Sequence, residues 1–201
     1  MLALEAMGGD NAPGETCAGA IMACEKFTDL EIALVGDSEA IAPLLVNTCA
    51  PVRKRLHLVH AEEKIAMDEP PAVAVRKKRG SSLRIAMQMV RSGEAQGCVS
   101  AGSTGAIVAA GVLVVGRIPG IERPGLGVPL PAVNRISMLI DIGATVRCKP
   151  LNLFQFALMG DVYMRKIIGV DSPSIGLLSN GQEEAKGDEL IIEAREYFKN
   201  G

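Results

Sequence analysis

The sequence predicts an α/β protein in three layers, with a mainly parallel β-sheet covered by helices on both faces. Short apolar runs of strand length alternate along the chain with longer stretches whose apolar residues recur at helical spacing. Of the 201 residues, 48% are hydrophobic but only 3% are aromatic, so we expect a core of aliphatic side chains. We expect one α/β domain over residues 1–201.

Composition argues against several classes of protein. The formal net charge of −2 gives no reason to expect a nucleic-acid partner. The 5 cysteines have no metal-ligand spacing, which indicates free thiols in a reducing compartment and no metal site. The longest apolar run, residues 106–115, is shorter than the roughly 20 residues that cross a bilayer, and no signal peptide is recognisable. We therefore expect a cytoplasmic protein.

In the first half of the chain, strands and helices are predicted to alternate. Strands are expected at residues 2–6, 31–35, 56–60 and 98–100. Helices are expected at about residues 13–27, 38–46, a stretch containing 76–79, and 82–92. Pro13 suits a first helical turn, where its missing N–H is not needed. Ser81 and Ser82 are expected to cap the helix 82–92, and Gly93 to end it.

The second half begins with a buried helix that ends near residue 115. Residues 117–135 form a Pro/Gly-rich excursion, in which the prolines argue against a regular helix or a central strand. Further on, a buried strand is expected at 136–140 and another strand at 174–178, with helices from about 150 and from about 188.

The turn between the strand 98–100 and the following helix is a candidate anion site. It consists of Gly102, Ser103, Thr104 and Gly105. Small residues at a helix N-terminus leave backbone N–H groups free, and both these groups and the helix dipole favour negative charge. The pattern also fits an ordinary strand-to-helix turn with a Ser/Thr cap, and these residues alone leave both interpretations open.

Three more unusual loops follow predicted strands. They span residues 7–11, 141–149 and 179–187, and they carry Asp10, Asp141, Glu183, Glu184, Lys149 and Lys186. Ligands of parallel sheets bind beyond the carboxyl ends of the strands, so the loops together predict an enzyme for a phosphate-bearing or anionic substrate. The basic run 76–79 is either a solvated helix end or a docking patch for an acidic partner.

Several segments resemble one known family when they are taken together and in order. They are residues 5–10, 67–69 with 76–77, 100–106, 123–124, 141–146 with 148–150, 155–157 with 159–160, and 181–187. This set is similar to the PlsX family of phosphate acyltransferases of bacterial phospholipid synthesis. The resemblance implies transfer of a fatty acyl group from acyl carrier protein to inorganic phosphate, without a cofactor. It also implies a fold similar to the isocitrate and isopropylmalate dehydrogenases.

The same resemblance implies a homodimer that works at the inner face of the cell membrane, and a longer chain of which residues 1–201 are the N-terminal major part. It implies that Gly102, Ser103, Thr104 and Gly105 bind phosphate. Lys149, Lys186 and Asp10 are its catalytic candidates. Asn11, Arg76, Lys77 and Lys78 are its candidates for contacting the substrate or its carrier.

The sequence also departs from the family pattern. Ser103 and Thr145 stand where the family has Asn, so each keeps a hydroxyl but lacks an amide that both donates and accepts. Glu5 replaces Asp, Arg147 replaces Asp and Gln182 replaces Glu. Two alternatives therefore stay open: a divergent or truncated paralogue that binds phosphate or a partner without turnover, and an enzyme similar to phosphate acetyltransferase. A nucleotide-binding dehydrogenase is disfavoured, because no Gly-x-Gly-x-x-Gly follows the first strand.

Overall fold

The computed structural model describes residues 1–133, 135–145, 147–181 and 186–200, except for the side chain of Asn200. Its contacts divide the chain into two compact units, Met1–Gly116 and Arg117–Gly201. The expectation of one domain over residues 1–201 concerns how the units combine, and it stays a prediction.

The first unit is built on a 4-stranded sheet in the order β3-β2-β1-β4, and the paired strands are all parallel. The strands are β1 (Leu2–Glu5), β2 (Ile32–Gly36), β3 (Leu56–His60) and β4 (Cys98–Val99). β2 is buried along its whole length, as expected of a strand with neighbours on both sides and helices on both faces. All four strands were predicted from their apolar runs.

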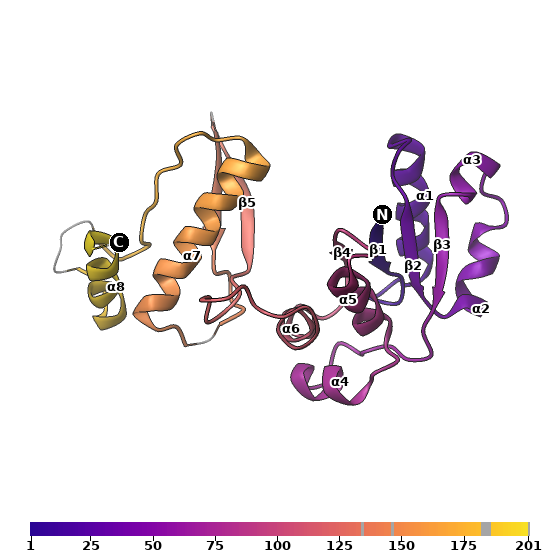
Figure 1. The fold of residues 1–201 in the computed structure, drawn as a ribbon, viewed down its shortest axis with the longest axis horizontal. Coiled ribbons are helices and arrows are strands. Elements are labelled where there is room, and N and C mark those ends of the chain that lie inside the picture. Colours follow the sequence, from indigo (N-terminus) through magenta and orange to yellow (C-terminus); the bar gives the residue numbers. More distant parts are fainter. Residues whose placement is uncertain (134, 146, 182–185, 201) are drawn as a thin grey trace. The chain divides into compact units, whose positions relative to one another are not determined.

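Helices cover both faces of this sheet (Figure 1). One face carries α1 (Gly14–Lys26), α2 (Ser38–Ile41), the 3-10 turn η1 (Ala42–Leu45) and α3 (Ala50–Arg53). Leu34 of β2 packs there against Cys17 and Cys24 of α1. Val35, the next residue of β2, points to the opposite face and packs with Ala86 of α5 (Ser82–Ser92). The predicted three-layer α/β class is therefore confirmed; the closer likeness to the dehydrogenases stays a prediction.

A further apolar cluster joins α5 to α4 (Pro71–Lys77) and α6 (Thr104–Ala110). The helical path of α6 continues through a π-helical turn, η2 (Gly111–Val115), as the apolar run predicted. The expected burial is only partial, because Ala106, Ala110 and Val114 are buried whereas Leu113 and Val115 are exposed. A Cβ on Gly105 would lie 2.8 Å from Cγ of Pro71, so glycine lets the start of α6 approach the start of α4 closely. Gly93 ends α5 in the left-handed conformation, with φ at +84°, which confirms its predicted role.

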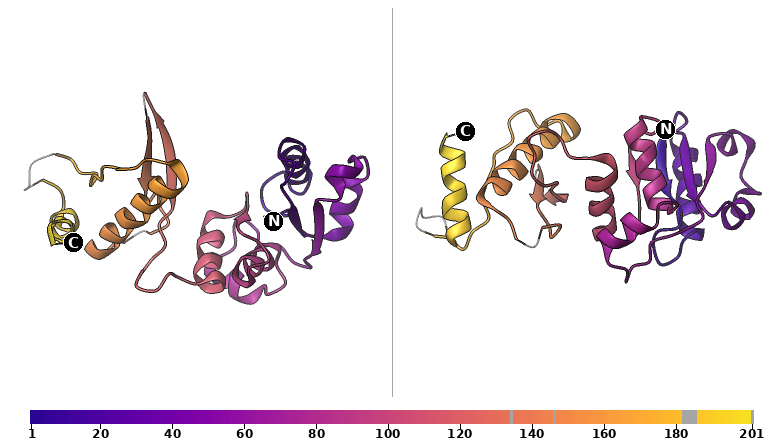
Figure 2. Two further views of the ribbon diagram at one scale, coloured as in Figure 1. Left: turned by 45° about the horizontal axis from the view of Figure 1, so that its top comes forward. Right: turned by 60° about the horizontal axis from the view of Figure 1, so that its bottom comes forward.

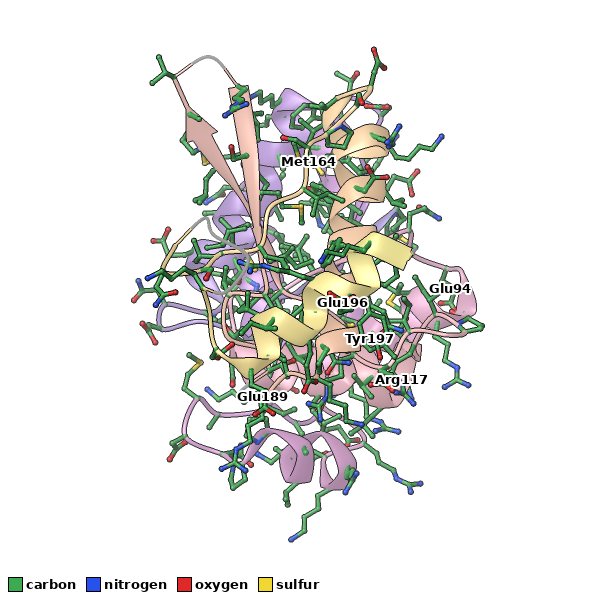
Figure 3. All side chains as sticks on the ribbon, turned by 90° about the vertical axis from the view of Figure 1, so that its left-hand side faces the viewer. Glu94, Arg117, Met164, Glu189, Glu196 and Tyr197 are labelled. Carbon is green, nitrogen blue, oxygen red and sulfur yellow. The ribbon has the colours of Figure 1, made fainter. Side chains whose placement is uncertain are left out.

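The second unit contains a β-hairpin and helices. β5 (Gly127–Ala132) pairs antiparallel with β6 (Arg135–Ile140), and α7 (Pro150–Tyr163) lies along this hairpin (Figure 2). A π-helical turn, η3 (Met164–Ile168), extends α7, and α8 (Glu189–Asn200) packs against α7. Tyr197 of α8, labelled in Figure 3, has its ring centroid 6.2 Å from that of Phe154 in α7.

The excursion 117–135 contains β5, which belongs to a two-stranded ladder and is not a central strand, in agreement with the prediction from its prolines. Two expectations in the second unit and one in the first need correction. The strand expected at 136–140 forms as β6, but it belongs to the hairpin and is mostly exposed rather than buried. Residues 174–178 form no strand; all five line a cavity of about 350 Å³ together with residues of β6 and α7. In the first unit, Ser81 precedes α5 without capping it, because its hydroxyl donates to the carbonyl of Lys78.

Candidate functional site

The turn after β4 is shaped by two serine side chains. The hydroxyl of Ser100 accepts the N–H of Gly102 at 3.0 Å, which folds the chain back directly after the strand. Ser103 then occupies the N-cap of α6, where its hydroxyl accepts the N–H of Ala106 at 3.4 Å. The carbonyl of Ser103 accepts the N–H of Ile107 at 3.0 Å, so the helix begins immediately. The structure therefore confirms that this turn contains a serine N-cap, which was one of the two interpretations of the sequence.

The same turn also leaves donors free. Within the part of the chain that the structure describes, no hydrogen bond uses the N–H groups of Ser103, Thr104 or Gly105. They lie at the N-terminal end of a continuous helical path that runs to residue 115. Unpaired N–H groups at such an end attract anions, so this turn can receive a phosphate oxygen. Gly102 differs from the other three, because its N–H already donates to Ser100.

The loop 7–11 packs directly on this turn. A Cβ on Gly8 would lie 2.9 Å from the backbone nitrogen of Gly102, and one on Gly9 would lie 3.2 Å from Cβ of Ala101. Gly9 also has φ at +102°, a conformation that favours glycine. Asp10 and Asn11 follow with exposed side chains, and the carbonyl of Asn11 accepts the N–H of Glu15 at 3.2 Å near the start of α1.

Sequence reasoning assigned no role to the residue that joins these loops. Glu5, the last residue of β1, is only 2% exposed, and its carboxylate accepts hydrogen bonds from the hydroxyls of Ser82 and Ser100. A signal was present, because Glu5 occupies an inward position of an otherwise apolar strand.

Burial, with a further contribution from the negative charge of Glu5, raises the pKa of the Cys98 thiol to about 11.

The basic run 76–79 begins in the last turn of α4 and continues past its end, and its members have different environments. The side chains of Arg76 and Lys77 are exposed. Lys78 instead forms an ion pair with Glu69 at 2.6 Å and donates to the carbonyl of Lys64 at 2.9 Å. The hydrogen bond from Lys78, together with the N–H of Ala66, lowers the pKa of the Glu69 carboxyl. Lys78 thus fastens the loop 64–69 to the end of α4.

In the second unit, Asp141 organises the loop that precedes α7. Its carboxylate accepts the N–H groups of Leu126 at 3.2 Å, Ala144 at 3.0 Å and Thr145 at 2.8 Å. Burial, and to a lesser degree Asp141, raises the pKa of the Cys148 thiol. The Asp141 carboxylate therefore accepts hydrogen bonds from backbone N–H groups, and these bonds hold the conformation of the loop.

Lys149 is the N-cap residue of α7, with an exposed side chain. Its backbone N–H donates to the side-chain oxygen of Asn152 at 2.9 Å. A lysine at a helix N-terminus adds a full positive charge to the partial positive charge of the helix dipole, and both favour an anion. Lys186 is also exposed, whereas Glu183 and Glu184 lie outside the described residues.

Two buried amides of α7, which sequence reasoning gave no functional role, tie down the segment 120–122. Asn152 is 1% exposed and donates to the Glu122 carboxylate at 3.0 Å. Gln155 accepts the N–H of Glu122 and donates to the carbonyl of Gly120, each at 2.8 Å. This accounts for the conformation of the first part of the Pro/Gly-rich excursion, where regular structure is absent.

The four loops belong to two different units. The structure brings 7–11 and 100–105 together in the first unit, and it places 141–149 and 179–187 in the second. That all four meet at one site stays a prediction. Among the described residues there is no group of His, Cys, Asp and Glu side chains that could hold a metal ion. No helix of the described part is both long and apolar enough to cross a membrane.

Fold and turn together define an α/β protein with a turn of free backbone N–H groups beside the carboxyl ends of β1 and β4. Comparison with known proteins is specific: residues 1–201 match the family described as fatty acid synthesis protein. The chain belongs to this family, and the predicted membership of the PlsX family is confirmed.

The similar proteins carry one name. A phosphate acyltransferase of Heliobacterium modesticaldum is 50% identical over 193 residues, which are 96% of this chain and 57% of that protein. A phosphate acyltransferase of Bacillus cereus is 45% identical over 94% of this chain and 56% of that protein. One of Geobacter sulfurreducens is 44% identical over 99% of this chain and 57% of that protein. The chain thus spans little more than half the length of these relatives.

Proposed function

We propose that this chain is part of an enzyme that transfers a fatty acyl group from acyl carrier protein to inorganic phosphate. The product is an acyl phosphate for phospholipid synthesis. The observation that carries the proposal is the turn 102–105, whose free N–H groups suit the one substrate that every reaction of this type requires. The printed names of the relatives, phosphate acyltransferase, support the same reaction class.

The reaction needs little from the protein beyond placement and charge. A phosphate oxygen attacks the carbonyl carbon of the acyl thioester, and the carbonyl oxygen becomes negatively charged in the tetrahedral intermediate. The carbon–sulfur bond then breaks, and the thiolate of the carrier leaves and takes up a proton. Phosphate is already a nucleophilic anion, so the chief tasks are to hold it beside the thioester and to stabilise the developing oxyanion.

The residues divide between these tasks. The N–H groups of Ser103, Thr104 and Gly105 and the hydroxyls of the first two seat the phosphate, and Gly102 allows the close approach of the loop 7–11. Asp10 and Asn11, the last two residues of this loop, orient the bound substrate. Lys149 and Lys186, both exposed cations, stabilise the oxyanion. Arg76 and Lys77 on α4 contact the acidic carrier protein.

Acyl phosphate formation tests the proposal directly. The purified chain is mixed with palmitoyl acyl carrier protein and inorganic phosphate, and free carrier protein and acyl phosphate are measured. We expect release that requires phosphate. If activity appears only when the chain is extended to the length of its relatives, the site needs residues beyond these 201. Release of coenzyme A from acyl coenzyme A, with none from the carrier protein, would favour the phosphate acetyltransferase alternative.

Single substitutions test the proposed roles in whichever form is active. Lys149→Ala and Lys186→Ala are each expected to lower kcat/KM by about 100-fold, as does loss of one oxyanion donor in other enzymes. Lys166→Ala serves as the control, because Lys166 is also an exposed lysine of the second unit but follows α7. Values within a few-fold of wild type for Lys186→Ala would show that its assignment is wrong. Inactivity of every form would favour a protein that binds phosphate or a partner without turnover.

A further inference from the structure

Glu5 connects the end of β1 to the turn 102–105 and to α5. One oxygen of its carboxylate accepts the hydroxyl of Ser82 at 3.0 Å, and the other accepts the hydroxyl of Ser100. The Ser100 hydroxyl oxygen in turn accepts the N–H of Gly102 at 3.0 Å. A continuous chain of hydrogen bonds therefore runs from a residue 2% exposed at the end of β1 to the first glycine of the turn 102–105.

We propose that Glu5 is a positioning residue for phosphate. It acts through Ser100 and Gly102 to fix the backbone of the turn, and it does not touch the phosphate itself. The proposal rests on the function proposed above and adds to it a residue for which neither the motifs nor the family match suggested such a role.

The chemistry of the carboxylate gives the hydrogen bonds one direction. A carboxylate only accepts, whereas a serine hydroxyl has one proton to donate and lone pairs with which to accept. Because the proton of Ser100 is directed to Glu5, its lone pairs are left to accept from Gly102. The Gly102 N–H is thereby held inward, and the free N–H groups that follow it are set in one orientation.

The backbones of both loops pack closely against the Glu5 carboxylate. A Cβ on Gly8 would lie 2.7 Å from Oε2 of Glu5, and one on Gly102 would lie 3.2 Å from the same oxygen. The backbones of both loops thus lie against this one side chain. Ser82 is the first residue of α5, so the carboxylate also lies near a helix N-terminus, where the helix dipole stabilises negative charge.

Glu5 has a second hydrogen bond that serves as an internal control. Its bond to Ser82 joins the sheet to α5 and reaches the turn only through Glu5 itself, whereas its bond to Ser100 leads directly to Gly102. A residue that only stabilised the fold would act through both. A positioning residue affects phosphate binding through Ser100 alone.

The experiment compares wild type with Ser100→Ala, Ser100→Thr, Ser82→Ala, Glu5→Gln and, as an exposed control on α1, Glu25→Gln. For each variant of the chain, circular dichroism checks folding, calorimetric titration gives the Kd for inorganic phosphate, and NMR gives the hydrogen-exchange rate of the Gly102 amide. We expect Ser100→Ala to raise the Kd by about five- to tenfold, the effect of losing one hydrogen bond, and to speed exchange at Gly102. Glu5→Gln, which introduces a donor into the network, should shift both in the same direction.

Two variants should behave as wild type in these readouts. Ser100→Thr keeps the hydroxyl, so its Kd for phosphate and its exchange rate at Gly102 should match those of wild type. Ser82→Ala should leave the Kd within about twofold of the wild-type value. The proposal is overturned if folded Ser100→Ala and Glu5→Gln bind phosphate as wild type does, or if Ser82→Ala weakens binding as much as Ser100→Ala. If wild type itself binds no phosphate, the proposed function fails with it. In that case the hydrogen-exchange rates of the Gly102 amide in wild type and Glu5→Gln still show whether Glu5 orders the turn.

Discussion

Lys78 differs from its basic neighbours because its charge is already used within the protein. It bridges Glu69 and the carbonyl of Lys64, while Arg76 and Lys77 project into solvent. The sequence shows four consecutive basic residues and cannot distinguish them, since the partner Glu69 lies on a separate loop. The prediction that Lys78 contacts substrate remains open, but the structure gives it a second, structural task.

The ion pair between Lys78 and Glu69 should make the stability of the fold depend on pH. The pKa of Glu69 is lowered in the folded protein, so its ion pair stabilises the fold above the ordinary carboxyl pKa and is lost as pH falls through the lowered value. Urea unfolding of wild type and Lys78→Met between pH 3 and 7 should show a difference that shrinks at the acid end. Lys77→Met is the control, and its free energy of unfolding should stay close to that of wild type at every pH. If the difference in free energy of unfolding between Lys78→Met and wild type does not change with pH, this role of the Lys78–Glu69 ion pair is wrong.

Asp141 is expected to be a structural acceptor rather than a catalytic group. Its carboxylate accepts three backbone N–H groups, and an asparagine replaces one of its oxygens by a donor. Asp141→Asn should therefore lower the free energy of unfolding by about 1–3 kcal/mol, the cost of leaving a backbone donor unpaired. The exposed Asp171→Asn is the matched control. Chemical denaturation measures the free energy of unfolding of both variants. If Asp141→Asn is as stable as wild type, this structural role of Asp141 is wrong.

At the scale of elements, two glycines of the first unit should respond oppositely to alanine. Gly93 ends α5 with φ at +84°, where a Cβ is strained, so Gly93→Ala should destabilise by about 1 kcal/mol. Gly19 lies inside α1 with open space around its position, so Gly19→Ala should stabilise by about 0.5–1 kcal/mol. Thermal unfolding of the two variants measures both signs, and a stabilising Gly93→Ala would contradict the left-handed cap.

The exposed end of α4 is the element that should recognise the carrier protein. In the active form of the enzyme, Arg76→Glu combined with Lys77→Glu should raise KM for palmitoyl acyl carrier protein several-fold and leave KM for phosphate unchanged. Lys54→Glu combined with Lys166→Glu changes the net charge equally at other exposed positions. Steady-state kinetics at two salt concentrations tests this, and equal effects of the two double variants would show that only net charge matters.

Element-level prediction succeeded where the sequence carries its own signal. The runs that form β1 to β4 are bounded by turn residues, and α5 has both an apolar stripe and a glycine stop. It failed for residues 174–178, whose apolar pattern suits a strand but whose environment offers no paired edge in the described part. Whether an apolar run becomes a strand depends on a partner that lies far away in the sequence.

For the molecule as a whole, the sequence located the loops but not the side chains that hold them. Gly8, Gly102 and the hydroxyls of the turn were visible as a motif. The connection from Glu5 through Ser100 was not, because it joins residues 95 positions apart. The anchoring of residues 120–122 by Asn152 and Gln155 was hidden for the same reason. Such contacts follow from tertiary packing, to which local patterns do not respond.

The proposed function depends on phosphate binding at the turn 102–105. Its most direct test is a titration of the ¹⁵N-labelled chain with inorganic phosphate, followed at every resolved amide at once. We predict that the amides of Ser103, Thr104 and Gly105 shift together along one saturating curve. A Thr104→Pro variant loses one of these three donors, so the curves of Ser103 and Gly105 should saturate at a higher phosphate concentration. Saturating shifts confined to Lys149 and the first turn of α7, or no saturating shifts at all, would contradict phosphate binding at this turn.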